Sequence, residues 1–248
     1  MRAVILAGGT GSRLRPYTLV LPKPLVPVGD RPILQLILAQ LARDGCWRVD
    51  LCVGHLGSLI QTYFSDPHNL PDGMELGYHW EDEPLGTAGA LRNIEGLEEP
   101  FLAMNGDILT DLNFGDLMAA HRSNDAALTI ATYNKTHQVS LGVIEQSDGV
   151  VSDYVEKPSM EYEVSMGIYA YSPRALEHIP EGYFDFPTLV KALLAAGEKI
   201  STYRFEGTWF DIGTPADYDG AVARFDQDGS TLLRDLTPTA VYPRPQPE

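Results

Sequence analysis

Cysteine is scarce in this sequence, and long hydrophobic runs are absent. Only Cys46 and Cys52 occur, and neither has partners at the spacing of metal ligands. Because cysteine is among the most buried residue types, we expect both to be reduced, buried thiols. No run of about 18 apolar residues is present, and the N-terminus leads straight into a strand pattern instead of a signal peptide. These absences predict a soluble, cytoplasmic protein without a membrane partner.

Basic residues are fewer than acidic residues. The 248 residues include 18 lysines and arginines against 34 aspartates and glutamates, for a formal net charge of −16. Nucleic acids and anionic membranes attract basic surfaces, so this balance argues against both as partners. A small phosphate-bearing substrate is still compatible with it, because phosphate binding depends on local donors and metal ions. We interpret the excess of acidic residues as a source of solubility.

The length fits one large α/β domain or two small ones, and no shift in composition marks a boundary. In the first half, apolar runs of strand length alternate with candidate helices of about ten residues. The strands are expected at residues 3–7, 49–53, 74–80, 101–105 and 126–133, and the helices at 33–43, 56–64, 87–93 and 116–123. Such alternation predicts an α/β fold, a single domain with a mixed, mostly parallel sheet flanked by helices.

The pattern changes in the second half. Residues 141–146 and 150–156 are expected to form a hairpin around Ser147-Asp-Gly149, and 164–171 a further strand, which predicts a small antiparallel portion. Helices are expected at 187–196 and 215–225, the second opened by Thr214 as N-cap and Pro215 at its first position. Little periodicity follows. We therefore predict a domain over residues 1–226 and a C-terminal tail over 227–248 that frays.

A glycine-rich, cationic loop follows the first strand. It reads Leu6-Ala7-Gly8-Gly9-Thr10-Gly11-Ser12-Arg13, and Lys23 follows between two prolines. The glycines let backbone N–H groups approach phosphate oxygens, while Arg13 and Lys23 can neutralise a departing pyrophosphate. The loop matches neither a P-loop nor a dinucleotide fingerprint. It predicts a triphosphate cradle, and the alternative is a tight strand-to-helix turn without a ligand.

Two aspartates are candidate Mg²⁺ ligands. Asp107 follows the apolar strand 101–105, at the carboxyl end where ligands bind in open α/β sheets. Asp211 lies in an apolar segment before a helix, and a buried carboxylate needs a partner, which a metal shared with Asp107 would supply. The alternatives are an Asx-type turn at 105–107 and a capping role for Asp211, for which Thr214 is better placed.

Two further segments are weaker signals. Residues 81–90 place several small residues at a helix start, where a nucleobase could lie, although small residues are also common there for packing. Glu156 and Lys157 precede Pro158, where broken strand pairing would let Glu156 meet a sugar hydroxyl and Lys157 a phosphate. The alternative is a solvent-facing strand end. The histidines form no cluster of the kind that binds a metal. We expect the tyrosines of the second half to be packing residues rather than sugar contacts.

Six motifs follow one another along the chain. They are the loop from Leu6 to Arg15, Leu21-Pro-Lys-Pro-Leu25, Pro84-Leu-Gly-Thr-Ala-Gly89, Asn105-Gly-Asp107, Glu156-Lys-Pro158 and Phe210-Asp-Ile-Gly-Thr-Pro215. In this order they closely resemble the sugar-1-phosphate nucleotidylyltransferase family, also called NDP-sugar pyrophosphorylases. The resemblance covers residues 2 to about 225 and is nearest to the short branch of mannose- and heptose-1-phosphate guanylyltransferases.

The resemblance implies a glycosyltransferase A-like nucleotidyltransferase fold, with the antiparallel portion binding sugar. It implies transfer of a nucleotidyl group from an NTP to a sugar 1-phosphate, giving NDP-sugar and pyrophosphate, with Mg²⁺ as cofactor. The implied catalytic residues are Arg13, Lys23 and Lys157. The implied nucleotide contacts are Leu6, Ala7, Gly8, Gly9, Thr10, Gly11, Ser12, Arg13, Lys23, Pro84, Gly86, Thr87, Asn105 and Asp107. The implied sugar-phosphate contacts are Gly142, Glu156, Lys157, Gly167 and Asp211, and the implied metal ligands are Asp107 and Asp211.

The resemblance favours GTP with a manno- or heptose-type 1-phosphate. UTP, CTP or dTTP with another sugar 1-phosphate is the alternative, and Ser165 stands where the guanylyltransferase branch commonly has Asn, which leaves the sugar open. The implied mechanism is in-line attack on the α-phosphorus without a covalent intermediate. A transferase using an NDP-sugar donor and a non-catalytic nucleotide-sugar-binding regulatory subunit are the alternatives of other classes. The oligomeric state is open, a homo-oligomer included.

Overall fold

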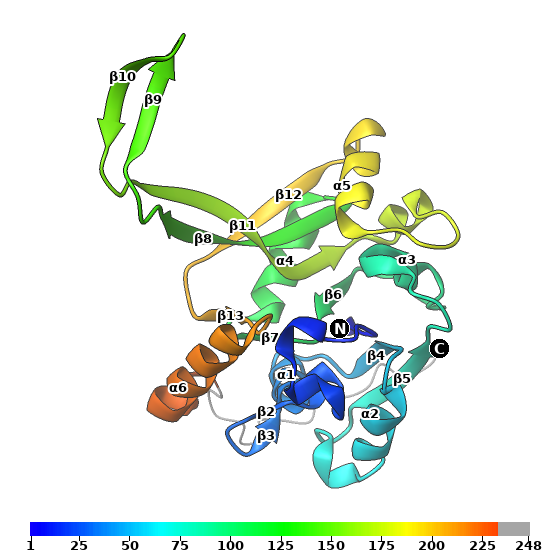
Figure 1. Ribbon diagram of the computed structural model, residues 1–248. Coiled ribbons are helices and arrows are strands. Elements are labelled where there is room, and N and C mark those ends of the chain that lie inside the picture. The colour runs from blue at the N-terminus through cyan, green and yellow to red at the C-terminus, as the bar shows by residue number, and fades with distance from the viewer. Residues whose placement is uncertain (233–248) are drawn as a thin grey trace.

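Seven strands form one sheet through the middle of the molecule (Figure 1). The computed structural model describes residues 1–232, without the side chains of residues 226 and 228–232. In order across the sheet the strands are β12 (Ile200–Phe205), β8 (Leu128–Gln138), β11 (Ser159–Tyr171), β6 (Phe101–Asn105), β1 (Arg2–Ala7), β4 (Arg48–Val53) and β5 (Glu75–Trp80). Strand β11 runs antiparallel to its neighbours β6 and β8, and the other pairs of this sheet are parallel. The predicted mixed, mostly parallel sheet is confirmed.

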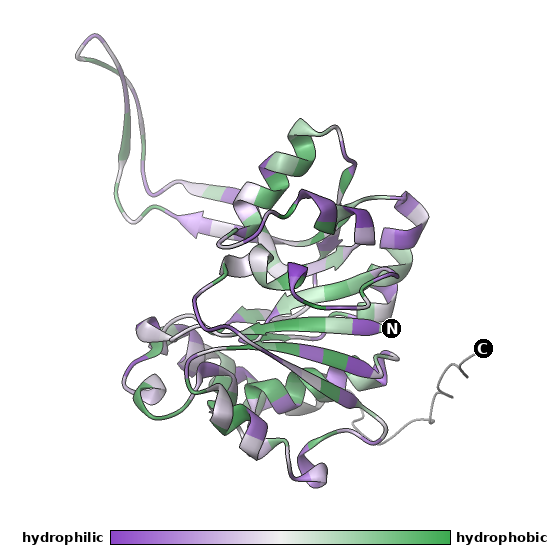
Figure 2. Cartoon of the chain, turned by 90° about the vertical axis from the view of Figure 1, so that its right-hand side faces the viewer, coloured by the Kyte–Doolittle hydropathy of each residue, from purple (hydrophilic) through white to green (hydrophobic). Residues whose placement is uncertain are grey.

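Helices cover both faces of the sheet. One face carries α1 (Ile33–Arg43), α2 (Gly57–Tyr63), α4 (Phe114–Asn124) and α6 (Pro215–Leu232), and the other carries α3 (Gly86–Arg92) and α5 (Phe186–Ala195). Successive side chains of a strand point to opposite faces, so on β1 Ala3, Ile5 and Ala7 join the first apolar core and Val4 joins the second. Figure 2 accordingly shows apolar residues along the central strands. Three layers result, as expected for an α/β domain.

Helix α6 begins where the sequence predicts but ends later. Thr214 and Asp217 cap it reciprocally, because Asp217 N donates to Thr214 Oγ1 at 3.3 Å and Thr214 N donates to Asp217 Oδ2 at 2.9 Å. The Tyr218 hydroxyl then donates to Pro27 O at 2.8 Å and anchors the first turns. Once a helix is nucleated, extension costs little. Residues 227–232, predicted as fraying tail, are therefore helical, and the rest of the predicted tail, 233–248, lies outside the described residues.

The predicted antiparallel portion is a hairpin of β9 (Val143–Ser147) and β10 (Val150–Val155). Asp148 and Gly149 have φ values of 52° and 81°, which suit the tight turn of a two-residue hairpin. The long strands β8 and β11 carry the hairpin away from the body of the molecule, as both views show (Figures 1 and 2). Every residue of β9 and β10 is exposed, so the hairpin has no core of its own.

The remaining elements are short. They are β2 (Pro27–Val28), β3 (Arg31–Pro32), β7 (Ile108–Thr110), β13 (Trp209–Asp211) and the 3₁₀ helices η1 (Ser12–Leu14), η2 (Tyr17–Leu19), η3 (Lys23–Leu25), η4 (Pro67–Asn69) and η5 (Pro173–His178). The sequence did not predict β7 or β13, and it also missed β12 of the central sheet. The antiparallel pairing of β7 with β13 places Asp211 opposite Ile108, the residue after Asp107. Two distant parts of the chain thereby meet.

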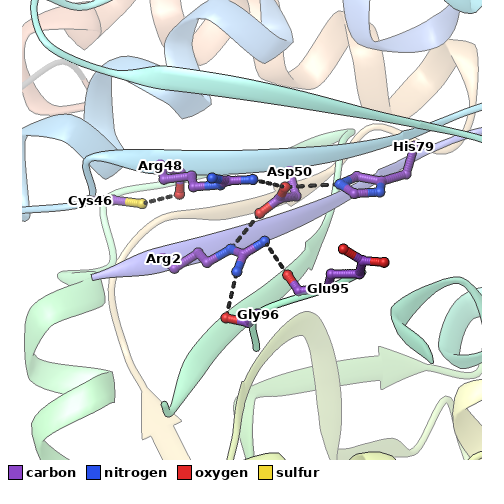
Figure 3. Close-up of polar contacts among 7 residues, drawn as sticks. All are labelled: Arg2, Cys46, Arg48, Asp50, His79, Glu95 and Gly96. Atoms are coloured by element: carbon purple, nitrogen blue, oxygen red, sulfur yellow. Dashed lines mark hydrogen bonds and ion pairs between the residues drawn. The ribbon is translucent and has the colours of Figure 1, made fainter. Parts of the chain in front are cut away.

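A buried carboxylate ties three strands together. Asp50, in the middle of β4, is fully buried and surrounded by basic side chains (Figure 3). Arg2 Nε donates to Asp50 Oδ2 at 2.6 Å, while His79 and Arg48 lie 2.9 and 3.5 Å from Oδ1. Burial alone would raise the pKa of Asp50, but the hydrogen bonds from Arg2 and His79 and the charges of Arg2 and Arg48 outweigh it and lower that pKa. The cluster joins β1, β4 and β5.

The two cysteines are buried and free, as predicted. Burial raises the pKa of the Cys46 thiol to about 12 and raises the pKa of Cys52 as well. Because the thiolate is the reactive form, both side chains act as packing residues. In the described part of the chain, no helix combines the length and the apolar character needed to cross a membrane.

Candidate active site

A cavity of about 690 Å³ opens at the carboxyl ends of β6, β1, β4 and β5, which are four parallel neighbours. Ligands of open α/β sheets bind at this edge. All residues predicted to contact the nucleotide line this cavity, from the glycine loop and Lys23 to Pro84, Gly86, Thr87, Asn105 and Asp107. The lining also contains residues that the sequence prediction missed: Pro24, Gly54, His55, Glu81, Asp82, Gly106 and Gly213. The predicted residues thus meet at one place, while their individual roles stay predictions.

The glycine loop turns sharply at Gly11. Its φ of 60° lies in the left-handed region that favours glycine, and a Cβ there would lie 2.9 Å from Thr18 Cγ2. The Thr18 hydroxyl donates to Gly11 O at 2.7 Å and holds the turn. Helix η1 starts at once, with Gly11 as its N-cap, and carries Arg13 to the cavity. The loop is therefore held by packing before any ligand binds.

Lys23 and Asp107 form an ion pair in the cavity. Lys23 Nζ donates to Asp107 Oδ2, and the two side chains are only 12% and 19% exposed. The other carboxylate oxygen, Asp107 Oδ1, is buried and has no hydrogen-bond partner in the described structure. A buried acceptor without a partner is costly. This oxygen therefore fits a donor or a cation that arrives with the ligand.

Asp211 lies beside this ion pair. Ile212 N donates to Asp107 O at 3.0 Å, which holds the chain after β13 against the end of β6. Asp211 is exposed, so the burial expected from its apolar neighbours is wrong. The neighbouring protein still removes part of its hydration, and this desolvation raises its pKa. The negative charge of Asp107 raises that pKa further, whereas Lys23 and Arg13 oppose the shift. Gly213 lies between Arg13 and Asp211, since a Cβ there would lie 3.9 Å from Arg13 Cζ and 3.8 Å from Asp211 Oδ1.

Asp107 and Asp211 are the residues that would hold a magnesium ion. Among the described residues, no group of three or more histidine, cysteine or acidic side chains has a metal-binding arrangement. Mg²⁺, however, usually binds through one or two carboxylates and completes its shell with water and substrate phosphates. The free Oδ1 of Asp107 and the raised pKa of Asp211 fit such an ion, because a cation would relieve both.

The opposite end of the glycine loop faces a different carboxylate. A Cβ built on Gly8 would lie 3.2 Å from Glu81 Oε1, so the Glu81 side chain lies over the start of the loop. Leu85 N donates to Glu81 Oε2 at 3.2 Å. Burial raises the pKa of Glu81, and the Leu85 N–H only partly offsets this. The strand-end rule could have identified this residue, because Glu81 directly follows β5.

The small residues of α3 pack against a segment from the second half of the chain. Ala88 N and Gly89 N both donate to Phe184 O, at 3.0 and 2.8 Å, and a Cβ on Gly89 would lie 2.6 Å from Gly182 O. Thr87 Oγ1 accepts from Phe186 N at 2.8 Å. These small residues therefore pack closely against residues 182–186, and Gly86 and Thr87 also line the cavity, so the predicted base contact stays a prediction. Helix α3 thus reaches the cavity while held by residues 182–186.

The structure places the predicted sugar contacts in different parts of the molecule. Gly167, with φ of 72°, packs against Asn105 of the cavity, where a Cβ would lie 2.7 Å from Asn105 Nδ2. Gly142 instead lies against the Tyr154 ring at the base of the hairpin, and Glu156 accepts from the Tyr154 hydroxyl at 2.9 Å. None of the five predicted sugar-phosphate contacts belongs to the described lining of the cavity, Gly167 and Asp211 included.

Lys157 does leave the regular strand, as the sequence predicts. Strand β10 ends at Val155, and Lys157 has a φ of 46°, unusual for a residue other than glycine. Its Nζ lies 3.9 Å from Glu156 Oε1, and both side chains are more than half exposed. An exposed pair of this kind contributes little to stability. Because regular strand pairing has ended, the alternation of a strand does not fix the directions of the Glu156 and Lys157 side chains.

Histidines and tyrosines behave mostly as the sequence predicts. His121 is buried between Thr129 and Ser172, and burial with nearby Arg174 and Arg122 lowers its pKa. Tyr169 and Tyr171 are buried packing residues, as predicted, whereas Tyr162 and Tyr183, for which packing was also predicted, are exposed. His55, which follows β4, is the histidine that reaches the cavity lining in the described chain.

Comparison with known proteins gives consistent matches. The Nucleotidyl transferase family profile matches residues 2–227. The mannose-1-phosphate guanylyltransferase catalytic subunit beta of Dictyostelium discoideum is 32% identical over 225 residues, covering 88% of this chain and 62% of that protein. The UTP–glucose-1-phosphate uridylyltransferase of Synechocystis sp. is 31% identical over 244 residues, covering 90% and 62%. This chain therefore spans about 62% of the length of these curated relatives.

Among solved structures, HddC from Yersinia pseudotuberculosis complexed with GMP-PN has the same fold. The TM-score is 0.68 at 28% sequence identity, and the match covers 90% of this chain and 99% of that chain. The α/β fold inferred from the sequence is thus found in a solved relative of nearly the same extent.

Proposed function

This chain belongs to the nucleotidyl transferase family, and from that premise we propose that it transfers a nucleotidyl group from an NTP to a sugar 1-phosphate, releasing pyrophosphate. One observation supports this proposal most strongly. The glycine loop, the Lys23–Asp107 ion pair and Asp211 lie together at one edge of the sheet. Cationic donors and available carboxylate oxygens side by side suit a substrate that is itself a polyanion with a metal.

The triphosphate lies along the glycine loop in this proposal. Backbone N–H groups of the loop, Arg13 and Lys23 neutralise the charge that develops on the leaving pyrophosphate. The Lys23 ammonium has three donors, so it can hold Asp107 and a phosphate oxygen at the same time. Asp107 and Asp211 would hold Mg²⁺, which supplies further neutralisation of the phosphates.

The second substrate approaches from the hairpin side. Lys157 binds the phosphate of the sugar 1-phosphate, and Glu156, Gly142 and Gly167 contact the sugar. A phosphate oxygen attacks the α-phosphorus in line as pyrophosphate leaves, with no covalent intermediate on the protein. The protein contributes by holding two anions together in the reactive geometry. The hairpin base lies outside the cavity lining in the described structure.

GTP with a manno- or heptose-type 1-phosphate is the favoured substrate pair. The support is the sequence similarity to a mannose-1-phosphate guanylyltransferase and the structural similarity to HddC, whose complex contains GMP-PN. UTP is the second candidate, because the Synechocystis uridylyltransferase is similarly close. Two free, buried cysteines are compatible with a reducing compartment, and we place the reaction in the cytoplasm.

The decisive experiment is pyrophosphate release with Mg²⁺, measured for GTP, UTP, CTP, ATP and dTTP against a panel of sugar 1-phosphates. Release that needs both one NTP and one sugar 1-phosphate supports the proposal and identifies the substrates. Tight nucleotide-sugar binding without release in any combination would instead favour the regulatory subunit. Transfer of sugar from an NDP-sugar without pyrophosphate would favour the other transferase class.

A further inference from the structure

The strand that carries Asp211 is held by a carboxylate outside the cavity. Asp111 follows β7 directly, and its Oδ1 accepts a hydrogen bond from Thr208 N at 2.7 Å. Asp111 N in turn donates to Thr208 O at 3.2 Å. One residue thus binds both backbone groups of Thr208, which comes just before β13. Asp111 is absent from the described lining of the cavity, so any effect it has on the reaction passes through the strand that it holds.

The contact between Asp111 and Thr208 continues the register of β7 and β13, which lie side by side (Figure 1). This ladder has three pairs, and the last one joins Ile108 to Asp211. Asp111 and Thr208 form the next pair beyond its other end. A two-stranded ribbon is marginally stable by itself, so a contact at its end matters. A slip of one residue would move Asp211 by about 3.3 Å and turn its side chain to the opposite face.

The turn before β13 has no room for a side chain. Strand β12 ends at Phe205, and the chain passes through Gly207 as it leaves the central sheet. A Cβ built on Gly207 would lie 2.4 Å from Asp111 Oδ1 and 2.4 Å from Phe205 Cζ. Glycine at this position lets the Asp111 carboxylate approach the backbone closely. The hydrogen bond and the space kept for it therefore point to the same role for Asp111.

We propose that Asp111 is a positioning residue for the magnesium site, an inference that rests on the proposed function and concerns how Asp211 is placed. Asp107 comes just before β7 and Asp211 ends β13, so the distance between their carboxylates depends on the register of these two strands. Mg²⁺ requires near-octahedral geometry with short bonds to oxygen, and it tolerates little displacement of a ligand. The hydrogen bonds between Asp111 and Thr208 therefore set the metal affinity through Asp211.

The first test compares Asp111→Ala with Asp111→Asn, which keeps an oxygen acceptor for Thr208 N but removes the charge. Binding of Mn²⁺, a paramagnetic substitute for Mg²⁺, is measured on the whole protein by electron paramagnetic resonance. Asp111→Ala should bind Mn²⁺ about 10-fold more weakly, as is typical when a group that orients a metal ligand is lost. Asp111→Asn should bind nearly as the parent protein does. Equal losses in the two variants would overturn the proposal, because Asp111 would then act through its charge, and so would an unchanged affinity in Asp111→Ala.

Asn113→Ala is the matched control. Asn113 lies in the same loop, and its Oδ1 accepts from Asp116 N at 3.0 Å and caps helix α4. The variant also removes a side-chain acceptor of a backbone N–H, so it should lower Tm, as the loss of a cap does. Its affinity for Mn²⁺ should be unchanged. A similar loss of affinity in Asn113→Ala would overturn the proposal, since any destabilisation of this loop would then weaken the site.

The second test needs no metal. Amide hydrogen exchange over residues 207–213 reports how firmly β13 is paired. Exchange should be roughly 10-fold faster in Asp111→Ala, which loses a hydrogen bond to a charged group, and should match the parent protein in Asp111→Asn and Asn113→Ala. Unchanged exchange in Asp111→Ala would overturn the proposal. A parent protein that binds no Mn²⁺ would instead refute the metal site of the proposed function, and the positioning role would fall with it. Binding by the parent without any difference among the variants would refute only the role of Asp111.

Discussion

At the residue scale, Asp211 shows a conflict between stability and function. Desolvation and the charge of Asp107 both disfavour its ionised form. We therefore expect Asp211→Asn to leave the thermal stability of the metal-free protein unchanged or higher, because the isosteric amide carries no charge. Turnover should fall on the order of 100-fold or more, since a metal ligand would be lost. Thermal unfolding in EDTA and Mg²⁺-dependent pyrophosphate release measure the two effects.

Asp219→Asn is the control for Asp211, because Asp219 is an exposed residue of helix α6. It should change neither quantity. Near-normal Mg²⁺-dependent turnover in Asp211→Asn would remove Asp211 from the metal site. A large fall in stability would show that its carboxylate is structural.

Asp50 is the clearest case of a residue that stabilises the fold through its charge. Its pKa in the folded protein lies below the ordinary value of 3.8. The stabilisation is therefore complete above that ordinary value and is lost as the pH falls through the lower folded value. Asp50→Asn should destabilise the protein by about 3 kcal/mol near neutral pH, because Arg2 loses its buried partner.

Urea unfolding of the parent and Asp50→Asn proteins, from roughly pH 7 down to pH 3, tests this linkage. The difference between the two should shrink only below the ordinary aspartate pKa. Asp72→Asn, at an exposed position, should show no difference at any pH. A difference that is constant over the whole range would mean that Asp50 contributes shape and not charge.

At the element scale, helix α3 depends on the loop that packs against its first turn. Replacing glycine by alanine in a helix normally stabilises by up to about 1 kcal/mol. In Gly89→Ala, however, the new Cβ would lie 2.6 Å from Gly182 O and would push residues 182–186 away. We expect a net loss of about 1–2 kcal/mol, since overpacking costs more than helix propensity returns. Weaker nucleotide binding should follow, because Gly86 and Thr87 of the same helix line the cavity.

Gly220 provides the matched comparison within the same chain. It lies in helix α6, and a Cβ built there meets nothing within 4 Å. Gly220→Ala should therefore stabilise the protein by up to about 1 kcal/mol. The opposite signs of the two glycine variants, measured by denaturant unfolding, are the prediction. Equal signs would mean that residues 182–186 yield easily and do not support α3.

At the scale of the whole molecule, nucleotide binding should stabilise the folded state by mass action. At about 100 times the dissociation constant, GTP with Mg²⁺ should add about 2.7 kcal/mol. For a chain of this length that corresponds to a rise in Tm of about 5–10 °C. The rise should be much smaller when EDTA replaces Mg²⁺ or when Asp211 is replaced by Asn. A protein whose Tm responds to no NTP would contradict the assignment of the cavity to nucleotide.

Local residue order predicted much of the fold. Apolar runs predicted every strand of the sheet except the edge strand β12, and turn residues predicted the hairpin. Hydrophobic periodicity and glycine or proline positions act over a few residues, so both predictions rest on local sequence. The same locality explains the failures. The short strands β7 and β13 have little pattern of their own and exist through their pairing with each other. Helix α6 extends to Leu232 because its first turns are anchored on a distant segment.

The sequence predicted those residues of the cavity that belong to contiguous motifs. The glycine loop with Arg13, the lysine between two prolines and the aspartate at a strand end were all predicted to meet at the nucleotide, and they line one cavity. Local signals were enough for this inference because ligands bind at the carboxyl ends of parallel strands, and strand ends can be recognised in the sequence.

Only the tertiary structure decided which distant groups touch. It paired Lys23 with Asp107 and laid the Glu81 carboxylate over Gly8. The proximity of Asp211 and Asp107 was expected from the sequence, but the pairing of β13 with β7 that produces it was not. The sequence by itself determined the residue types and the strand-end positions, because both are local properties. Desolvation and charge pairing depend on three-dimensional neighbours, so the pKa values of Asp211 and Glu81 emerge only once the chain is folded.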